Sequence, residues 1–306
     1  MKIHAFLILA HKQPQLLARI MKVLEKSNHY FFVHVDAKTN IDDFITSTDG
    51  IKNLHFIENR VKVYHRGMSI VDAEMQLLNC AHRQYGGYDY YHLISGQCYP
   101  LRTNEQFDEF FENTDESFMC FDRGEFAASM QKHYKYCADE FHFNNTDTLG
   151  SRVYEKLRLG KILSLFWHRS KIKGYTGGWQ WFDWTNRVAE YVLDYMQKHE
   201  EYYKRFNYTG SPDEHIFVTL LSDKIQELKV SPYEPLRYVS WHANHHVETE
   251  YRPYDLDERD YQYIIGTATF FCRKVVFPVS EKLLDMIDEQ REIAEFDYDT
   301  ADKNFF

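Results

Sequence analysis

The first hundred residues alternate between strand and helix patterns, and this alternation constrains the fold more than any other feature of the chain. Short apolar runs predict strands at 3–9, 30–35, 54–57 and 90–94. One predicted helix begins at Pro14 and a second spans 69–83. Strands separated by helices predict a largely parallel sheet, in which ligands bind beyond the carboxyl ends of the strands. His11, Asp36 and Ser95 lie at such ends and are therefore candidate binding residues.

A second informative segment, 210–215, places Asp213 and Glu214 in the first turn of a predicted short amphipathic helix. Ser211 can cap this helix and Pro212 suits its first position. An apolar stripe follows, at Ile216, Phe217, Leu220 and Leu221. Glu214 can serve there as a catalytic base, or it can complete a capping box on the backbone N–H of Ser211. The segment alone leaves both interpretations open.

Composition narrows the class of protein. The 306 residues include 23 Tyr and 23 Phe, and aromatic faces suit sugar rings and nucleobases, although most such side chains fill cores. The net charge of −10 argues against a nucleic-acid binder with a broad basic face. Local basic residues can still hold one diphosphate.

Cysteine and histidine spacing argues against disulfides and a zinc site. The five cysteines are odd in number and lack a C-x-x-C spacing, which predicts reduced thiols in the cytosol. They are Cys80, Cys98, Cys120, Cys137 and Cys272. His242, His245 and His246 are the densest histidine cluster, without H-E-x-x-H or finger spacing. A loop lining a polar pocket fits them better than a metal site.

The start of the chain lacks a signal-peptide pattern, and nowhere do ~18 apolar residues run together. We therefore expect a cytoplasmic protein whose membrane contact, if any, is peripheral at the inner face. The middle of the chain contains a basic, helical-looking stretch at 152–173. This stretch is either a solvated or membrane-facing helix or part of an acceptor-side subdomain, and the sequence does not decide between them.

Residues 177–182 read Gly-Gly-Trp-Gln-Trp-Phe. Paired glycines let a backbone approach a ligand, and Trp179 and Trp181 can form a wall. No linker or internal repeat divides the chain, which predicts one domain over 1–306. Its expected parts are a nucleotide-binding half at about 1–104, a variable insertion at about 105–175, and an acceptor and catalytic half at about 176–290.

Eight blocks carry a family resemblance across about residues 3–285. They lie at 7–12, 34–36, 64–74, 92–101, 177–182, 211–214, 237–241 and 270–274. Their order resembles the core-2/I-branching β-1,6-N-acetylglucosaminyltransferase family, which also includes the peptide O-xylosyltransferases. Bacterial members of this kind lack the membrane anchor and disulfides of the Golgi enzymes, and this chain looks like that bacterial type.

The resemblance implies a GT-A-type α/β fold, with a Rossmann-like, mostly parallel central sheet flanked by helices. It implies inverting transfer from a nucleotide sugar without the usual metal-binding D-x-D, so we expect no metal and no cofactor besides the UDP-sugar substrate. It assigns Glu214 as the base and Asp36 as a nucleoside contact. Lys274, with Arg273 beside it and Arg252 before it, would neutralise the diphosphate.

The remaining candidates complete the donor and acceptor sites. The expected donor-binding residues are His11, Asp36, Arg66, Ser95, Arg252, Arg273 and Lys274. The expected acceptor-binding residues are Gln97, Trp179, Trp181 and Asp213. Two positions depart from the family pattern: Cys98 stands where many bacterial relatives have Asp, and His65-Arg66-Gly67 stands in place of an aromatic-Gly-Gly.

Physical chemistry supports these assignments independently. An inverting transfer needs one base for the acceptor hydroxyl, and fixed cations can meet the charge that develops on the diphosphate. Arg offers a fork and Lys a point charge. D-x-D look-alikes occur at 255–257 and 297–299, where we expect solvated surface acids.

The family resemblance thus implies transfer from a UDP-sugar to a hydroxyl of an oligosaccharide or lipid-linked glycan, in bacterial surface polysaccharide synthesis. GlcNAc is the first candidate sugar and xylose the second, with galactose and glucose also open. Two alternatives compete: a non-catalytic glycan- or nucleotide-binding module, and a hydrolase that uses Asp213 and Glu214 with water. A pure binder has no need of a base, and a hydrolase needs a second acid at a suitable separation.

Overall fold

The predicted amino-terminal strands and helices are confirmed. The computed structural model describes residues 1–85, 87–122, 124–157, 159–166, 172, 174–232, 236–240, 253–292, 298 and 301. The strands are β1 (His4–Ala10), β2 (His29–Val35), β3 (Leu54–Phe56) and β4 (Tyr90–Ser95). The helices between them are α1 (Pro14–Leu24), α2 (Asp42–Ser47) and α3 (Ser69–Tyr85). All four strands are parallel, in the order β3-β2-β1-β4.

Three later strands extend this sheet beyond β4. They are β7 (Gly178–Thr185), β6 (Ser117–Phe121) and β8 (Val230–Ser231), and the full order is β3-β2-β1-β4-β7-β6-β8. Strand β7 is antiparallel to both of its neighbours, whereas β6 and β8 are parallel to each other. The mostly parallel, Rossmann-like sheet expected of a GT-A-type fold is therefore confirmed.

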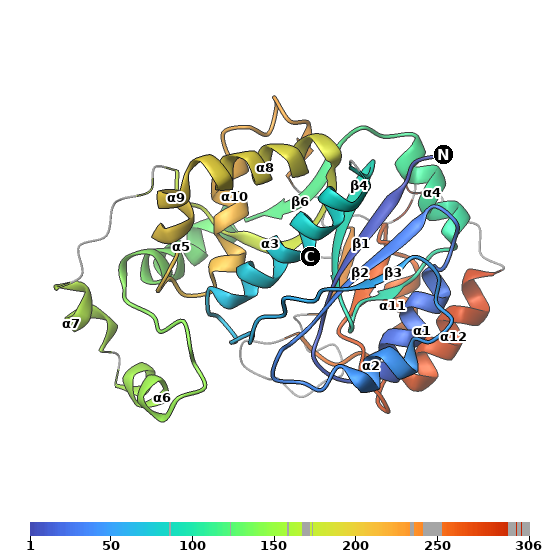
Figure 1. The fold of residues 1–306 in the computed structure, drawn as a ribbon, viewed down its shortest axis with the longest axis horizontal. Coiled ribbons are helices and arrows are strands. Elements are labelled where there is room, and N and C mark those ends of the chain that lie inside the picture. The colour runs from blue at the N-terminus through green and yellow to red at the C-terminus, as the bar shows by residue number, and fades with distance from the viewer. Residues whose placement is uncertain are drawn as a thin grey trace.

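Helices cover both faces of the sheet (Figure 1). On one face, α1 and α12 (Glu281–Arg291) pack over β1 and β2 together with α4 (Asn104–Glu112). On the other face, α3 and α8 (Asn186–Lys198) share a core with α10 (Ile216–Leu221). The helical stripes explain this layering, since Leu17, Ile20, Met21 and Leu24 of α1 are all buried against the strands.

A second, three-stranded sheet lies beside the first. Its order is β5 (Tyr99–Pro100), β10 (Phe271–Arg273) and β9 (Arg237–Val239). The 3-10 helix η2 (Glu258–Asp260) and α11 (Tyr261–Ile265) precede β10. This small sheet joins a segment near the end of the chain to the segment that follows β4, and so brings Arg273 close to Cys98.

The insertion contains α5 (Gly124–Asp139), α6 (Leu149–Lys156) and α7 (Gly160–Ser164), and α9 (Glu200–Arg205) follows α8. The basic stretch at 152–173 is therefore not one helix, because α6 ends at Lys156 and α7 begins at Gly160. Figure 1 shows α6 and α7 standing apart from the central sheet. All five cysteines are free. In the described part of the chain, no helix combines the length and apolar character needed to cross a bilayer.

Candidate functional site

The Ser-Pro-Asp-Glu segment forms a 3-10 turn, η1 (Pro212–Glu214), rather than the first turn of an amphipathic helix. The helix α10 that follows is buried on all sides. Ser211 adopts a left-handed conformation with φ of 47° and its side chain caps nothing. Its backbone N–H donates to the carbonyl oxygen of Arg66 at 3.1 Å. The capping-box interpretation is therefore wrong, because the N–H that a capping box would use is bonded elsewhere.

Glu214 belongs to a cluster of carboxylates. Burial and the negative charge of Asp213 raise the pKa of Glu214, and the charge of Asp122 raises it further. Burial and Asp213 also raise the pKa of Glu74 on α3, while burial raises that of Asp213. Gln180 donates to Glu74 Oε1 at 2.8 Å. Since desolvation favours the neutral acid, these carboxyl groups bind protons more tightly than exposed ones.

Within the described part of the chain, two carboxylate oxygens of this cluster have no hydrogen-bond partner. They are Asp213 Oδ1 and Glu74 Oε2, and both are buried. An unpaired buried acceptor costs free energy. A hydroxyl group of a ligand could donate to such an oxygen, so the cluster has unused capacity to orient an acceptor.

Arg66 supplies positive charge beside the acids. Its Nε donates to Ser211 Oγ at 3.3 Å, and its charge lowers the pKa values of Asp213 and Glu214, against the effect of burial. The next residue fits only as glycine, because a Cβ at Gly67 would lie 2.1 Å from the Asn144 carbonyl oxygen. The close approach of this loop fixes Arg66 over the η1 turn.

Arg273 supplies the second guanidinium group near Glu214. Its guanidinium carbon lies 4.3 Å from the centroid of the Trp181 ring, and its charge lowers the pKa of Glu214. Cys98 lies close enough to raise the pKa of Arg273, against the effect of burial, and Arg273 Nε has no hydrogen-bond partner among the described residues. Burial lowers the pKa of Arg273 itself. Trp181 is thus buried beneath a cation.

Cys98 lies close to Arg273 in this site. Its buried Sγ lies 3.3 Å from Ser95 Oγ, in the turn after β4. The turn after β4 therefore contributes a sulfur atom to the surroundings of the Arg273 guanidinium group.

The predicted nucleoside residues lie at the carboxyl ends of β1 and β2. Asp36 Oδ1 accepts from the backbone N–H groups of Lys38 at 2.9 Å and Val63 at 3.3 Å. His11 and Lys274 lie close enough to interact electrostatically, and so do His11 and Asp36. Asp36 therefore organises the loop after β2, while His11 interacts with both Asp36 and the predicted phosphate-binding lysine.

Lys274 connects the two halves of the site. Its Nζ lies 3.9 Å from Asp255 Oδ1, and its charge acts both on His11 and on His65, the neighbour of Arg66. Arg66 and Arg273 thus act on the acid cluster, while Lys274 acts on His11 at the nucleoside end and on His65 next to Arg66. Arg252 lies outside the described residues.

The predicted acceptor-binding residues lie in different surroundings. The Nε2 of Gln97 donates to the Val275 carbonyl oxygen at 3.3 Å, and the Val275 N–H donates to the Gln97 carbonyl oxygen. Gln97 therefore ties the turn after β4 to the segment after β10. Trp179 is half-buried on β7, and Asp213 lies in η1 beside Glu214.

The paired glycines approach protein groups, not a ligand, which corrects our interpretation of the Gly-Gly motif. A Cβ at Gly177 would lie 2.4 Å from the Tyr134 ring, and one at Gly178 would lie 2.2 Å from the Cys120 carbonyl oxygen. Both glycines therefore permit close packing of β7 against β6 and α5.

One D-x-D look-alike is not a pair of solvated acids, as we had expected. Asp257 is buried, caps η2 and hydrogen-bonds to Arg259, whereas Asp255 is more exposed and lies near Lys274. The acids of 297–299 and the cluster His242, His245 and His246 lie outside the described residues.

A cluster with metal-ligand spacing does exist, although at the other edge of the sheet. Among the residues that the structure describes, the group that meets this spacing is His4, His29 and Asp108. His4 and His29 begin β1 and β2, so the group lies at the amino ends of these strands. The acids near Glu214 do not meet the spacing within the same described set.

Sequence analysis missed several residues of the site. Glu74 ends the 64–74 block and carried a usable signal, whereas Asp122 follows β6 without any motif. A fully buried ion pair joins Arg237 Nη1 to Asp183 Oδ2 at 2.7 Å, and Asp183 Oδ1 lies 2.8 Å from His92 Nδ1. This pair joins β9 to β7 and β4 behind Arg273.

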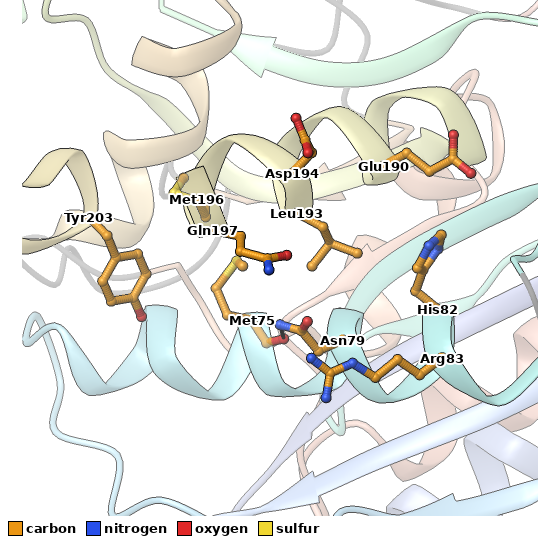
Figure 2. Close-up of a pocket in the computed structure, with 10 residues that line it drawn as sticks. All are labelled: Met75, Asn79, His82, Arg83, Glu190, Leu193, Asp194, Met196, Gln197 and Tyr203. Carbon is orange, nitrogen blue, oxygen red and sulfur yellow. Dashed lines mark hydrogen bonds between the residues drawn. The ribbon is translucent and has the colours of Figure 1, made fainter. Parts of the chain in front are cut away.

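A pocket of about 710 Å³ lies elsewhere, between α3 and α8 (Figure 2). Met75 and Asn79 of α3 face Leu193 and Gln197 of α8 across it. The pocket contains none of the predicted site residues, and we assign it no role.

The chain is similar to known glycosyl-transferring enzymes. The model of the Core-2/I-Branching enzyme family matches residues 4–265. The chain is 22% identical to human xylosyltransferase 2 over 303 residues, which covers 93% of this chain and 33% of that protein. It is also 22% identical to rat xylosyltransferase 1 over 303 residues, or 93% of this chain and 35% of the other. The chain thus spans about a third of the curated relatives it matches.

Solved structures show weaker likeness. The galactosyltransferase LgtC in complex with donor and acceptor sugar analogues is 12% identical, with a TM-score of 0.40 over 71% of this chain and 70% of the other. The apo form of mouse xyloside xylosyltransferase 1 is 11% identical, with a TM-score of 0.38 over 79% of this chain and 89% of the other.

Proposed function

Because the chain belongs to the Core-2/I-Branching enzyme family, we propose that it is an inverting glycosyltransferase that moves a sugar from a UDP-sugar to a hydroxyl of a glycan acceptor. One observation carries the proposal: Glu214, a carboxylate with a raised pKa, interacts with two guanidinium groups in the same cluster. A base and fixed cations are the two requirements of such a transfer.

Glu214 would act as the general base. The acceptor oxygen attacks C1 of the donor sugar, the C1–O bond to the diphosphate breaks, and the hydroxyl proton passes to Glu214. A raised pKa makes the ionised carboxylate a stronger base, closer to the optimum for transfer near neutral pH. Asp213 and Glu74, each with an unpartnered oxygen, would orient the acceptor.

Arg66, Arg273 and Lys274 would stabilise the departing UDP. The leaving diphosphate gains negative charge as the glycosidic bond breaks, and preorganised cations lower the free energy of that state. Arg273 is held on Trp181, so its position does not have to change during the reaction. These cations would replace a divalent metal ion, which makes the proposed reaction metal-independent.

The donor would be UDP-GlcNAc or UDP-xylose. The family resemblance favours the first sugar, and the likeness to proteins named xylosyltransferase supports testing the second. Asp36 and His11 would contact the nucleoside end of the donor. The acceptor would be an oligosaccharide or a lipid-linked glycan of bacterial surface polysaccharide synthesis, and the enzyme would work in the cytoplasm.

UDP release from a panel of donors tests this proposal directly. The protein would be incubated with UDP-GlcNAc, UDP-xylose, UDP-galactose or UDP-glucose, with and without acceptor saccharides, in the presence of excess EDTA. Acceptor-dependent release, with an inverted anomeric centre in the product by NMR, is expected. UDP release at the same rate with and without acceptor would indicate a hydrolase. Donor binding without UDP release would indicate a binding module.

A further inference from the structure

Exposed apolar side chains gather on α6 and α7. Of the twelve large hydrophobic residues that the described part of the chain exposes, seven lie between 149 and 166. They are Leu149, Val153, Leu157, Ile162, Leu163, Leu165 and Phe166, here called the α6–α7 patch. The exposed fractions reach 79% for Leu149 and 81% for Phe166. Single exposed apolar residues are ordinary, but such a concentration marks an interaction surface.

The exposure follows the helical period of α6. Leu149, Val153 and Leu157 are spaced four residues apart and form one stripe that faces away from the protein. The opposite side is anchored, since Tyr154 is buried and its hydroxyl donates to the Phe141 carbonyl oxygen at 2.6 Å. Helix α6 is therefore fixed on the protein with its apolar stripe outward.

The charge of this segment is opposite to that of the whole chain. Residues 149–173 contain seven Lys and Arg and one acid, Glu155, in a protein of net charge −10. Arg152, Lys156 and Lys161 are exposed beside the apolar stripe. A helix that only contacts water would not be expected to expose these leucines. A purely apolar protein contact would not be expected to place cations beside them. An anionic bilayer accommodates both, because apolar side chains enter the acyl boundary while cations meet lipid phosphates.

We propose that the α6–α7 patch docks this protein on the surface of an anionic lipid bilayer. Peripheral docking requires no membrane-spanning helix. Charge complementarity selects this partner, since each Lys or Arg near an anionic surface strengthens binding by about fivefold.

The docked face lies next to the candidate active site. Thr146, just before α6, donates to the His65 carbonyl oxygen at 2.9 Å, and Glu155 of α6 acts electrostatically on the His65 ring. Asp147 pairs with Lys38 at 3.0 Å in the loop after β2. If the proposed function holds, docking would bring a lipid-linked acceptor to the site; the docking itself does not depend on that function.

Vesicle sedimentation tests the proposal without any measurement of activity. The full chain is expected to pellet with vesicles of phosphatidylglycerol and phosphatidylcholine, to pellet far less with phosphatidylcholine alone, and to dissociate as salt rises. The variant R152Q/K156Q should bind about 25-fold more weakly, and L157D/F166D should bind at least about tenfold more weakly. All of these residues are exposed, so both variants should fold normally.

Matched controls change the same chemistry outside the patch. K198Q/K204Q removes two exposed cations from α8 and α9, and I45D replaces an exposed apolar residue of α2; both should bind vesicles like the unchanged protein. UDP release with a soluble acceptor should be unaffected by the patch variants. The proposal would be overturned if the patch variants bound vesicles as strongly as the unchanged protein, or if the unchanged protein did not bind phosphatidylglycerol vesicles. It would also be overturned if light scattering showed a dimer that L157D/F166D converts to a monomer.

Discussion

The substitution Glu214→Gln tests the base directly, because it preserves side-chain size and removes the group that accepts the proton. It is expected to lower kcat for sugar transfer by at least about 100-fold, the scale of a positioned base. UDP binding should be retained or strengthened, since the lost negative charge lies beside Arg66 and Arg273. A loss of activity with intact UDP binding separates catalysis from structural damage.

The pH dependence follows from the raised pKa of Glu214. Burial and the charge of Asp213 raise this pKa above its ordinary value of 4.5. Only the ionised form accepts a proton, so kcat should climb about tenfold per pH unit below the raised pKa and level off above it. The Glu214→Gln variant should lack this rise of kcat with pH, the acid limb of the profile. Asp213→Asn should move the acid limb to lower pH, because it removes a negative charge that raises the pKa of Glu214.

The pH dependence of the free energy of unfolding tests the raised pKa of Glu214 independently of catalysis. A carboxyl whose pKa is raised in the folded state binds its proton more tightly there, so its ionisation costs stability as pH rises above the unfolded value. Glu214→Gln should therefore increase the free energy of unfolding at neutral pH, and the gain should vanish in acid. Urea unfolding at several pH values measures it.

Initial rates of UDP release from about pH 5 to about pH 9 cover the relevant range. Calorimetry with UDP provides the binding constant for each variant. Glu201→Gln, at an exposed glutamate of α9, is the matched control and should change neither quantity. Near-normal kcat in Glu214→Gln, or a loss of UDP binding as large as the loss of rate, would refute the assignment of Glu214 as the base.

Three further substitutions test the surrounding groups. Lys274→Ala should cost roughly 3 kcal/mol of transition-state stabilisation, or about 150-fold in kcat/KM; activity that EDTA abolishes and manganese restores would contradict this role. Asp36→Asn keeps an acceptor for the Lys38 and Val63 amides but removes the charge, and should weaken UDP binding in calorimetry; an unchanged Kd would remove Asp36 from the site. Asp183→Asn leaves the buried Arg237 without its counter-charge and should lower the free energy of unfolding by about 3–5 kcal/mol. A loss below about 1 kcal/mol in urea unfolding would contradict that estimate.

The sequence predicts the amino-terminal half of the fold well because its elements are long and regular. Buried parallel strands such as β1 and β2 are continuous apolar runs, and α1 carries a clean apolar stripe. The short strands β5, β8 and β9 contain two or three residues each. No period can be read from so few positions, so pairing with distant segments decides their structure.

The same difference between local pattern and long-range packing decides which residues of the site could be predicted from the sequence. Residues at the ends of parallel strands could be placed from sequence, since the carboxyl ends of such strands meet at one edge. Glu74 carried a signal as the end of the 64–74 block, and Asp122 carried none. Neither could be placed beside Glu214 from sequence, because a helix position and a loop position reach the site only through the packing of α3 and β6. The contact of Arg273 with Trp181 and Cys98 likewise joins three distant segments.

The acid and the cations of the site are linked through their charges, and this link predicts how donor binding changes the base. Arg66 and Arg273 lower the pKa of Glu214 while burial and Asp213 raise it. A bound diphosphate would neutralise part of the charge on both guanidinium groups, so the pKa of Glu214 should rise further and the carboxylate should become a stronger base. The pH dependence of kcat reports the bound enzyme, whereas that of kcat/KM for the donor reports the free enzyme. The acid limb of kcat should therefore lie at higher pH than the limb of kcat/KM. Coincident limbs, or the reverse order, would show that the diphosphate does not bind against these two cations.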